Sequence, residues 1–583
     1  MHSLRRILAF LRPYRTLAVL APLFMLLEVV MDLTQPYLME HIVDVGIARL
    51  DMPVVLHTAM LMVGFAFIGL IGGVGCTVAA VRAATSAATD LRSALFAKVQ
   101  AFSFANLDRL GTGPLITRLT NDVTQIQDVI QVMLRILVRT PLLTIGCLIM
   151  AIVTSPQLAL LFVVLVPVLL GILTWGIRRS FPLFLRVQAT LDRLNTIAQE
   201  NLAGIRLVKA FVRGQHEWRR FRDTNEDLVA NNLRVANLMA ITMPLIMLTT
   251  NLGVAAVIWY GGIKVVQHGL LVGQVLAFVN YLAQMLGNLI MVGLLLIRVS
   301  RAEASAERIV TVLDMEPEVK DRPGALADFR PRGRVEFEHV SFGYGDGRVL
   351  EDINLVAEPG QMVAILGATG SGKSTLVQLI PRFYDVTAGR VTLDGVDVRD
   401  IRSDVLRRSV SIALQESVLF SGTIRDNIRY GRPDATDEEV EAAARAAQAH
   451  DFISSLPDGY DTQLGQRGVN LSGGQKQRLA IARALICRPA VLILDDSTSA
   501  VDLETEIKIQ EALAELRRGS GSSGPCTSFV IAQRISSVLR ADQIVVLDAG
   551  RIVGLGRHQE LMQTSSIYRQ IYELQLGNGV ADE

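Results

Sequence analysis

The stretch LSGGQKQRLAIARAL, residues 471–485, decides how the second half of this chain folds. A serine and two glycines precede a run of strong helix formers, so the stretch predicts a helix that begins close to Gly473. The first N–H groups of a helix lack partners inside it, and with the Ser472 hydroxyl they form a site for phosphate oxygens. The candidate residues at this helix start are Ser472, Gly473, Gly474 and Gln475.

A second phosphate-binding string, GATGSGKST, lies at 367–375, between the strand-like run MVAIL and a helical pattern. It fits the G-x-x-x-x-G-K-[ST] motif, whose glycines let backbone N–H groups surround phosphate oxygens, so a chance glycine turn is disfavoured. We expect Lys373 to reach the β- and γ-phosphates of ATP and Ser374 to ligate Mg²⁺. The nucleotide-binding candidates here are Gly367, Gly370, Ser371, Gly372, Lys373, Ser374 and Thr375.

The apolar run VLILDD at 491–496 reads as a strand that is buried on both faces and ends in two carboxylates. Open α/β sheets bind ligands at the carboxyl ends of their strands, which is where Asp495 lies. Asp495 is therefore expected to hold Mg²⁺ through water. A carboxylate that merely caps the strand is the alternative, which the neighbouring phosphate-binding loop disfavours.

The surroundings of these motifs predict an α/β P-loop nucleotide-binding domain over 334–583, with a largely parallel sheet. The predicted strands are VEFEHVSF at 335–342, QMVAILG at 361–367, SVSIAL at 409–414, AVLILDD at 490–496, SFVIAQ at 528–533 and QIVVLDAG at 543–550. Before them, MEPEVKDRPGALADFRPRG at 315–333 contains three prolines and two glycines and reads as a linker.

The first 314 residues predict an all-α transmembrane domain with six spans, because a spanning helix needs about 20 mostly apolar residues. The predicted spans are 17–43, 61–80, 134–153, 158–177, 238–263 and 270–297. The polar stretches 82–130 and 178–237 keep helical periodicity, so we expect the spans to continue as long cytosolic arms. Residues 1–14 read as an amphipathic interfacial helix.

The distribution of charge predicts the orientation in the membrane. Eleven Lys or Arg residues lie within 178–234, whereas the short loops on the other side carry only Arg49 and Lys264. The positive-inside rule therefore places both termini in the cytosol. The net charge of +1 gives no case for a nucleic-acid partner, and the four cysteines show no metal or disulfide spacing.

Polar side chains inside two predicted spans are candidates for a substrate cavity. Glu28 and Asp32 share a face of the first span, and Asn280, Gln284 and Asn288 form a stripe on the sixth. Intramembrane polar groups usually face the bundle interior or water, so these residues either meet substrate or hydrogen-bond between helices. The sequence leaves both alternatives open.

On these motifs the chain resembles an ABC transporter, since LSGGQ is that family's signature, and the resemblance extends over the whole chain to its exporters. It implies a head-to-tail dimer of nucleotide domains, with each ATP between one P-loop and the other chain's LSGGQ. It further implies that Tyr344 stacks on adenine, that Gln415 joins Mg²⁺ to the membrane-facing surface, and that 499–502 crosses the dimer seam. GTGPLITRLTNDV at 111–123 and NLAGIRLVKAF at 201–211 resemble the two cytosolic coupling segments of exporters.

The chain departs from the family at two catalytic positions. Asp496 stands where the family carries a glutamate general base, and Gln533 stands where it carries a histidine that contacts the γ-phosphate. A base must lie about 2.6–3.2 Å from the water it polarises, and a misplacement near 1 Å can cost ~10²-fold in rate. The resemblance is therefore closest to the degenerate subunit of heterodimeric bacterial multidrug exporters. Gln466 also replaces an acidic residue of the family, with no consequence that we can derive.

The sequence thus predicts half of a heterodimeric, ATP-driven exporter in the inner (plasma) membrane, which binds ATP and Mg²⁺ at a degenerate site. Its expected partners are a second half-transporter that carries the catalytic glutamate, the lipid bilayer, and a hydrophobic or amphipathic small-molecule substrate. Two alternatives remain: a homodimeric lipid flippase or exporter with slow ATPase activity, and a regulatory membrane subunit that senses ATP and transports nothing.

Overall fold

The computed structural model describes residues 2–345, 347–517 and 525–576, without the side chains of 2, 289–298, 300 and 536. The chain forms two compact units. Unit 1 comprises Met1–Gln100 and Thr112–Met315, and unit 2 comprises Ala101–Gly111 and Glu316–Glu583. Each unit is described by itself.

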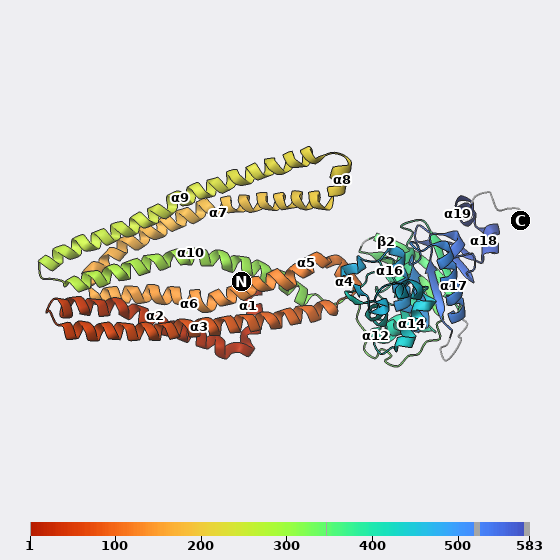
Figure 1. Cartoon of the computed structure of the whole chain (residues 1–583), viewed down its shortest axis with the longest axis horizontal. Coiled ribbons are helices and arrows are strands. Elements are labelled where there is room, and N and C mark those ends of the chain that lie inside the picture. The colour runs from red at the N-terminus through yellow and green to blue at the C-terminus, as the bar shows by residue number, and fades with distance from the viewer. Residues whose placement is uncertain (1, 346, 518–524, 577–583) are drawn as a thin grey trace. The chain divides into compact units, whose positions relative to one another are not determined.

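Unit 1 is built from long helices (Figure 1). They are α1 (His2–Ile7), α2 (Arg15–His41), α3 (Met52–Gln100), α5 (Thr112–Thr117), α6 (Val123–Thr154), α7 (Pro156–Ala203), α8 (Ile205–Ala210), α9 (Gly214–Val266) and α10 (Val272–Asp314). A 3₁₀ helix, Leu8–Tyr14, joins α1 to α2, so the interfacial helix predicted over 1–14 is α-helical only as far as Ile7. Two π-helical turns, Ile42–Ile47 and Arg118–Asp122, complete this unit's helical segments.

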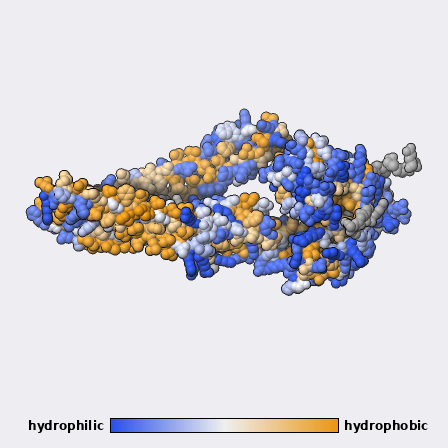
Figure 2. Space-filling view, turned by 60° about the horizontal axis from the view of Figure 1, so that its bottom comes forward, coloured by the Kyte–Doolittle hydropathy of each residue, from blue (hydrophilic) through white to orange (hydrophobic). Residues whose placement is uncertain are grey.

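The helix lengths and surfaces of unit 1 fit a membrane protein. With 53 residues, α9 is about 80 Å long, well over the ~30 Å hydrocarbon core of a bilayer. Five helices of the described residues are long and apolar enough to span a membrane, and the sixth predicted span lies in α10. Figure 2 shows hydrophobic side chains gathered along these helices, with hydrophilic residues at their left-hand end in that view. The predicted spans with long helical continuations are confirmed for these five helices.

Small residues let the helices of unit 1 approach closely. A Cβ atom on Gly72 of α3 would lie 2.9 Å from the Phe24 carbonyl oxygen of α2, so only glycine permits this crossing. A second core joins α6, α7, α9 and α10, where the rings of Phe162 and Phe278 are 5.3 Å apart. There Tyr281 is fully buried and donates a hydrogen bond to the Leu33 carbonyl.

The hairpin of α7 and α9 separates from the rest of unit 1. Figure 1 shows the two helices side by side, joined by α8, and running apart from α2, α3, α6 and α10 towards the α8 end. Side chains around α8 are consequently exposed, among them Leu207 at 63% and Phe211 at 69%. In the single chain, the α7–α9 hairpin therefore ends in apolar side chains that no other described part of unit 1 covers.

The described residues of unit 2 form three sheets. A six-stranded sheet has the order β12-β11-β3-β10-β9-β6, a four-stranded sheet the order β2-β1-β4-β5, and β7 pairs with β8. The strands are β1 (Val335–Tyr344), β2 (Gly347–Ala357), β3 (Met362–Gly367), β4 (Ala388–Leu393), β5 (Val396–Asp397), β6 (Val410–Ala413), β7 (Gly422–Thr423), β8 (Gln463–Leu464), β9 (Val491–Asp495), β10 (Thr527–Ile531), β11 (Gln543–Asp548) and β12 (Arg551–Gly556). The main helices are α11 (Lys373–Gln378), α12 (Ser403–Ser409), α13 (Ile424–Arg429), α14 (Asp437–Ala446), α15 (His450–Ser454), α16 (Gly473–Leu485), α17 (Leu503–Arg517), α18 (His558–Thr564) and α19 (Ser566–Leu576).

The six-stranded sheet confirms the predicted parallel core and needs one correction. Its neighbouring strands β11, β3, β10, β9 and β6 are parallel, and only β12 is antiparallel. The strand predicted at 335–342 does not join it, because β1 pairs antiparallel with β2 and β4 in the separate four-stranded sheet. The faces of the two sheets share one apolar core, which contains Phe337 of β1 and Phe529 of β10.

A short helix from the first half of the chain belongs to unit 2. In α4 (Phe104–Leu110), the Phe104 ring stacks on Phe383 at 4.2 Å, and Asp108 accepts a hydrogen bond of 2.6 Å from Tyr384. Asn106 binds the linker, donating to the Glu316 carbonyl at 3.1 Å. The first coupling segment was predicted at 111–123; the structure places Ala101–Gly111 in unit 2 and Thr112–Met315 in unit 1, and a coupling role for either stretch stays a prediction. The second predicted coupling segment, 201–211, contains α8.

Candidate functional site

The strand order brings three loops to one edge of the parallel sheet. The GATGSGKST loop follows β3, Gln533 follows β10, and Asp495 ends β9, while β10 pairs with both of the other strands. Because all three strands are parallel, their carboxyl ends meet at the same edge. Sequence motifs more than 100 residues apart therefore form a single site.

Glycines give the 367–375 loop its shape. Gly367 has φ +156°, and a Cβ there would lie 2.2 Å from the Leu547 carbonyl oxygen, so a side chain has no room. Gly370 has φ +83° with nothing within 4 Å of its Cβ position, which leaves open space beside the backbone. Gly372, at φ +99°, caps the start of α11. The loop is thus a cradle with an open side.

Polar groups inside the cradle fit a phosphate. The Oγ of Ser371 is buried and has no hydrogen-bond partner among the described residues. Lys373 Nζ donates to the carbonyl oxygens of Gly367 and Ala368, at 2.9 and 2.8 Å. Burial lowers the pKa of Lys373, and the carboxylates of Asp496 and Asp495 oppose that shift. A phosphate would supply an acceptor for the unpaired hydroxyl of Ser371 and a further acceptor for the ammonium of Lys373.

A pair of oxygens beside the loop fits a hard cation. Ser374 Oγ donates a 2.8 Å hydrogen bond to Asp495 Oδ1, as expected for two ligands of one Mg²⁺. Burial raises the pKa of Asp495, and the nearby charge of Asp496 adds to this. Gln415 is exposed on the segment after β6, the strand next to β9. A bound cation would offset the cost of the buried carboxylate.

The aromatic candidate lies next to the same loop. The Tyr344 hydroxyl is 3.3 Å from Thr375 Oγ1, at the end of the phosphate-binding string. Its ring meets Phe342 and Tyr384 edge-on, with centroids 5.0 and 5.2 Å apart, and remains 45% exposed. A base could therefore stack on the free part of the ring.

Asp496 and Gln533, the two departures from the family pattern, contact each other. Gln533 Nε2 donates to Asp496 Oδ2 at 2.7 Å. Asp496 is 7% exposed and has a left-handed backbone, with φ +48°, a conformation that is uncommon outside glycine and enriched in Asp and Asn. Burial raises the pKa of Asp496, while Lys373 and the Gln533 amide act against that rise. The carboxylate at the base position is therefore already held by a side-chain amide.

The signature stretch forms the predicted helix start. Ser472 caps α16: its Oγ accepts from the Gln475 N–H at 3.3 Å, and Gln475 Oε1 accepts from the Ser472 N–H at 2.9 Å. Ser472 and Gly473 are exposed, whereas a Cβ on Gly474 would lie 2.7 Å from the Ala500 carbonyl oxygen. The helix start is thus presented outward while its second glycine packs against the loop after β9.

Sequence reasoning missed two residues that connect these parts. Gln477 of α16 is buried, donates to Ser499 Oγ at 3.1 Å and accepts from the Ala500 N–H at 2.9 Å, which fixes the signature helix to the 496–500 loop. Glu506 of α17 is buried and accepts from Thr498 at 3.0 Å and Ser537 at 2.5 Å. Both make contacts that only the folded chain brings together, so no local sequence signal marks them.

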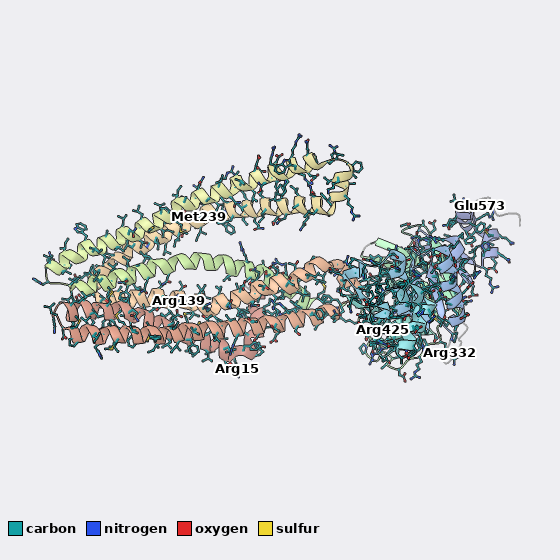
Figure 3. The ribbon with its side chains drawn as sticks, viewed as in Figure 1. Arg15, Arg139, Met239, Arg332, Arg425 and Glu573 are labelled. Carbon is teal, nitrogen blue, oxygen red and sulfur yellow. The ribbon has the colours of Figure 1, made fainter. Side chains whose placement is uncertain are left out.

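The intramembrane carboxylates have a partner that the sequence did not reveal. Arg139 of α6, labelled in Figure 3, lies 3.0 Å from Asp32 Oδ2 and 3.5 Å from Glu28 Oε1 of α2. Glu28 also packs on α3, since a Cβ on Gly73 would lie 3.1 Å from its Oε2. These contacts support interhelical bonding for the carboxylates, and the cavity-lining interpretation stays a prediction.

The polar stripe on α10 shows fewer contacts. Asn280 is exposed and donates to the Leu276 carbonyl of its own helix at 3.0 Å. Gln284 Oε1 lies 3.8 Å from the Cys147 sulfur of α6, and Asn288 is half-buried. A role in a substrate cavity stays a prediction for all three.

Comparison with known proteins covers both units. Residues 19–289 match the model of the ABC transporter transmembrane region, and residues 350–499 match the ABC transporter model. The uncharacterized ABC transporter ATP-binding protein YfiB of Bacillus subtilis is 42% identical, over 98% of this chain and 99% of that protein. The ATP-dependent lipid A-core flippase of Syntrophus aciditrophicus is 37% identical, over 83% and 80%. The putative multidrug export ATP-binding/permease protein YgaD of B. subtilis is 36% identical, over 99% and 100%.

A solved structure is similar to this chain over nearly its whole length. A bacterial Atm1-family ABC exporter with ATP bound superposes with a TM-score of 0.80 at 28% identity, over 98% of this chain and 99% of the other. Its likeness includes both the helical unit and the unit with the phosphate-binding loop. The chain belongs to the ABC transporter family, as an ATP-hydrolysing exporter with its membrane helices and its ATP-binding domain on one polypeptide.

Proposed function

We propose that this chain is one half of a heterodimeric exporter, and that its own P-loop retains ATP and cleaves it slowly. The observation that carries the proposal is the 2.7 Å hydrogen bond between Gln533 and Asp496. A general base must reach the attacking water, and the carboxylate of Asp496 is one methylene shorter than that of a glutamate. It is also engaged by an amide, which has no titratable charge.

Unlike the two catalytic positions, the positions that would bind ATP and Mg²⁺ match the family's motifs. Lys373 and the glycines of the loop would hold the phosphates, Ser374 and Asp495 would hold Mg²⁺ with Gln415, and Tyr344 would stack on the adenine. Mg²⁺ supplies charge neutralisation of the phosphates when it is bound. The orphaned Ser371 hydroxyl and the Ser374–Asp495 oxygen pair support this assignment.

Two exposed surfaces support a dimer. Ser472 and Gly473 present the start of α16 outward, where they would complete the hydrolytic site of a partner's P-loop. The apolar side chains around α8, including Leu207 and Phe211, need a protein surface to cover them. We assign that role to the nucleotide domain of a second half-transporter that carries the catalytic glutamate.

Transport would follow from closure of the two nucleotide domains on ATP. The α4 and α8 segments would pass the closure to the long helices and turn the cavity outward. We place the chain in the inner membrane with both termini in the cytosol, on the distribution of Lys and Arg. A hydrophobic or amphipathic small molecule is the proposed substrate, and the likeness to a putative multidrug exporter supports that class.

Isolation of the tagged chain from its own cells in mild detergent tests the proposal. We expect mass spectrometry to find, in equal amount, a second ABC half-transporter that carries a glutamate directly after the aspartate corresponding to Asp495. During steady turnover of that complex, ATP should occupy this chain's P-loop for many cycles of the partner. Mostly ADP at this site, or isolation of the chain as a homodimer alone, would contradict the proposal.

The likeness to a lipid A-core flippase favours a second candidate, a homodimeric lipid flippase with slow ATPase activity. It predicts ATPase activity from this chain without any other subunit, stimulated by lipid. In that case Asp496→Glu combined with Gln533→His should raise turnover of the purified chain at least tenfold, because a longer carboxylate and an imidazole restore the family's catalytic pair. A degenerate half-transporter alone would stay inactive after the same double change.

A further inference from the structure

Helix α19 (Ser566–Leu576) is firmly attached to the nucleotide-binding unit. Tyr568 is fully buried, and its hydroxyl lies 2.7 Å from His558 Nδ1 of α18. Arg569 Nε donates to the Met562 carbonyl at 3.0 Å, and Ile571 packs on the main core. A helix anchored at several points can hold another segment in place.

The last turn of this helix clamps the loop that carries Gln533. Gln575 Nε2 donates to the Gln533 carbonyl oxygen at 2.8 Å, and Gln575 Oε1 accepts from the Ile535 N–H at 2.7 Å. One side-chain amide therefore spans two residues of the loop and satisfies one acceptor and one donor of its backbone. A carboxylate could make only the second contact, and a lysine only the first.

The clamp continues to the base position. The same Gln533 whose carbonyl is held by Gln575 donates its side-chain amide to Asp496 Oδ2. Other parts of the loop are held by their own side chains: Arg534 lies 3.6 Å from Glu506 Oε2, and Ser537 bonds to Glu506 and to Gln510 of α17. Gln575 differs from these contacts because it binds the backbone of Gln533 itself, the residue whose side chain reaches Asp496.

We propose that Gln575 is a positioning residue, which keeps the Gln533 amide aimed into the nucleotide site and so prolongs the retention of ATP there. The inference rests on the proposed function, because it takes the P-loop of this chain to hold ATP. Loss of the clamp frees the backbone of 533–535, and the amide then spends less time in the site. A single hydrogen bond contributes modestly, so we expect release of nucleotide to become about three- to tenfold faster.

The experiment uses the full-length chain in detergent, loaded with the fluorescent nucleotide MANT-ATP and Mg²⁺ and chased with excess ATP. Gln575→Ala should release the probe about three- to tenfold faster than the wild type. Gln575→Glu should release it about as fast as Gln575→Ala, because it cannot donate to the Gln533 carbonyl. Glu573→Ala is the matched control, since Glu573 is exposed on the same helix two residues away (Figure 3) and should leave the release rate unchanged.

A mutant cycle separates positioning from general support. Gln533→Ala alone should accelerate release, and adding Gln575→Ala should have no further effect, because the two act through one side chain. If the double variant released the probe faster than Gln533→Ala, by the factor that Gln575→Ala shows alone, the inference would be overturned. An unchanged release rate in Gln575→Ala would overturn it too. Chromatography of the released probe keeps the two proposals apart: release mainly as MANT-ADP would contradict slow cleavage, while the mutant cycle still decides the role of Gln575.

Discussion

Asp496 and Gln533 are more informative as a pair than as two separate substitutions. Each replaces a catalytic side chain of the family, and in the fold each is the other's hydrogen-bond partner at 2.7 Å. A carboxylate whose oxygen accepts from an amide is less available to a water molecule. The amide, in turn, is neutral throughout the physiological pH range, so the pair is suited to hold the loop still rather than to move a proton.

Arg139 gives a prediction for the membrane helices. Arg139→Met removes the counter-charge of Glu28 and Asp32, and breaking a buried ion pair costs ~3–5 kcal/mol, less where the guanidinium is half-exposed as here. We expect a several-fold lower yield of monodisperse protein in size-exclusion chromatography of detergent extracts. The triple change Glu28→Gln, Asp32→Asn, Arg139→Met should restore most of it.

Arg15→Met serves as the control, since Arg15 is exposed at the start of α2 (Figure 3). It should leave the yield unchanged. If the double change Glu28→Gln and Asp32→Asn expressed well and altered export of cationic compounds alone, the carboxylates would line the substrate cavity after all, as the sequence allowed.

Local motifs pointed to the residues of the candidate nucleotide site but not to the side chains that contact them. The phosphate-binding loop, Asp495 and Ser472 could be predicted because their chemistry is encoded in short strings. Arg139, Gln477 and Gln575 could not, because their partners lie 19 to 111 positions away and meet them only in the fold. An Arg in an apolar span predicts a partner, yet the spacing along one helix cannot say on which other helix it lies.

The signature helix α16 and the loop after β9 pass close to each other, and glycine substitutions at this contact test the packing. A Cβ on Gly474 would lie 2.7 Å from the Ala500 carbonyl oxygen, whereas a Cβ on Gly473 would meet the Ala500 Cβ at an ordinary 3.5 Å. Gly474→Ala must therefore displace backbone, at a cost of about 1–3 kcal/mol. We expect a lower apparent melting temperature for Gly474→Ala and an unchanged one for Gly473→Ala. Equal melting temperatures for the two variants would refute this crossing.

The attachment of α19 should depend on pH. Burial lowers the pKa of His558 below its ordinary value of 6.5, so the folded chain takes up a proton less readily than the unfolded chain. Below about pH 6.5 the unfolded chain therefore carries more protons, and stability falls as the pH drops from there towards the folded-state pKa. We expect the melting temperature of the wild type to decrease relative to that of His558→Gln between pH 7.5 and 5.5. A constant difference between the two proteins would contradict it.

The predictability of the strands and helices depended on how completely each is buried. Strands β3, β9 and β10 are buried along nearly their whole length and were read from apolar runs. Strand β12 alternates between exposed and half-buried residues and was not predicted. Helix α4 was also missed, because seven residues are too few for a helical period to emerge and its docking depends on Phe383 and Tyr384, far along the chain.

Two surfaces of the single chain are exposed although their chemistry suits contact with another protein. The helical hairpin of α7 and α9, seen in Figure 1, ends in apolar residues that are exposed, and the signature helix has an exposed Ser472 at its start. The second nucleotide domain that we propose would cover both features. In the proposed dimer, the two ATP sites are unequal: one uses this chain's P-loop and the partner's signature, and the other uses the partner's P-loop and Ser472.

That inequality gives the prediction that decides between a degenerate half-transporter and a catalytic one. In the purified heterodimer, Ser472→Ala removes a preorganised donor for the γ-phosphate at the competent site, and loss of one such contact can cost ~10²–10³ in rate. Ser472→Arg should do worse, because it adds bulk between the domains. Asp496→Asn should leave most of the ATPase activity, since that carboxylate is already bound to Gln533. If instead Asp496→Asn abolished the ATPase activity of the complex while the Ser472 variants still turned over ATP, the catalytic base would lie in this chain. The proposed degenerate site, and with it the argument for a heterodimer, would then be wrong.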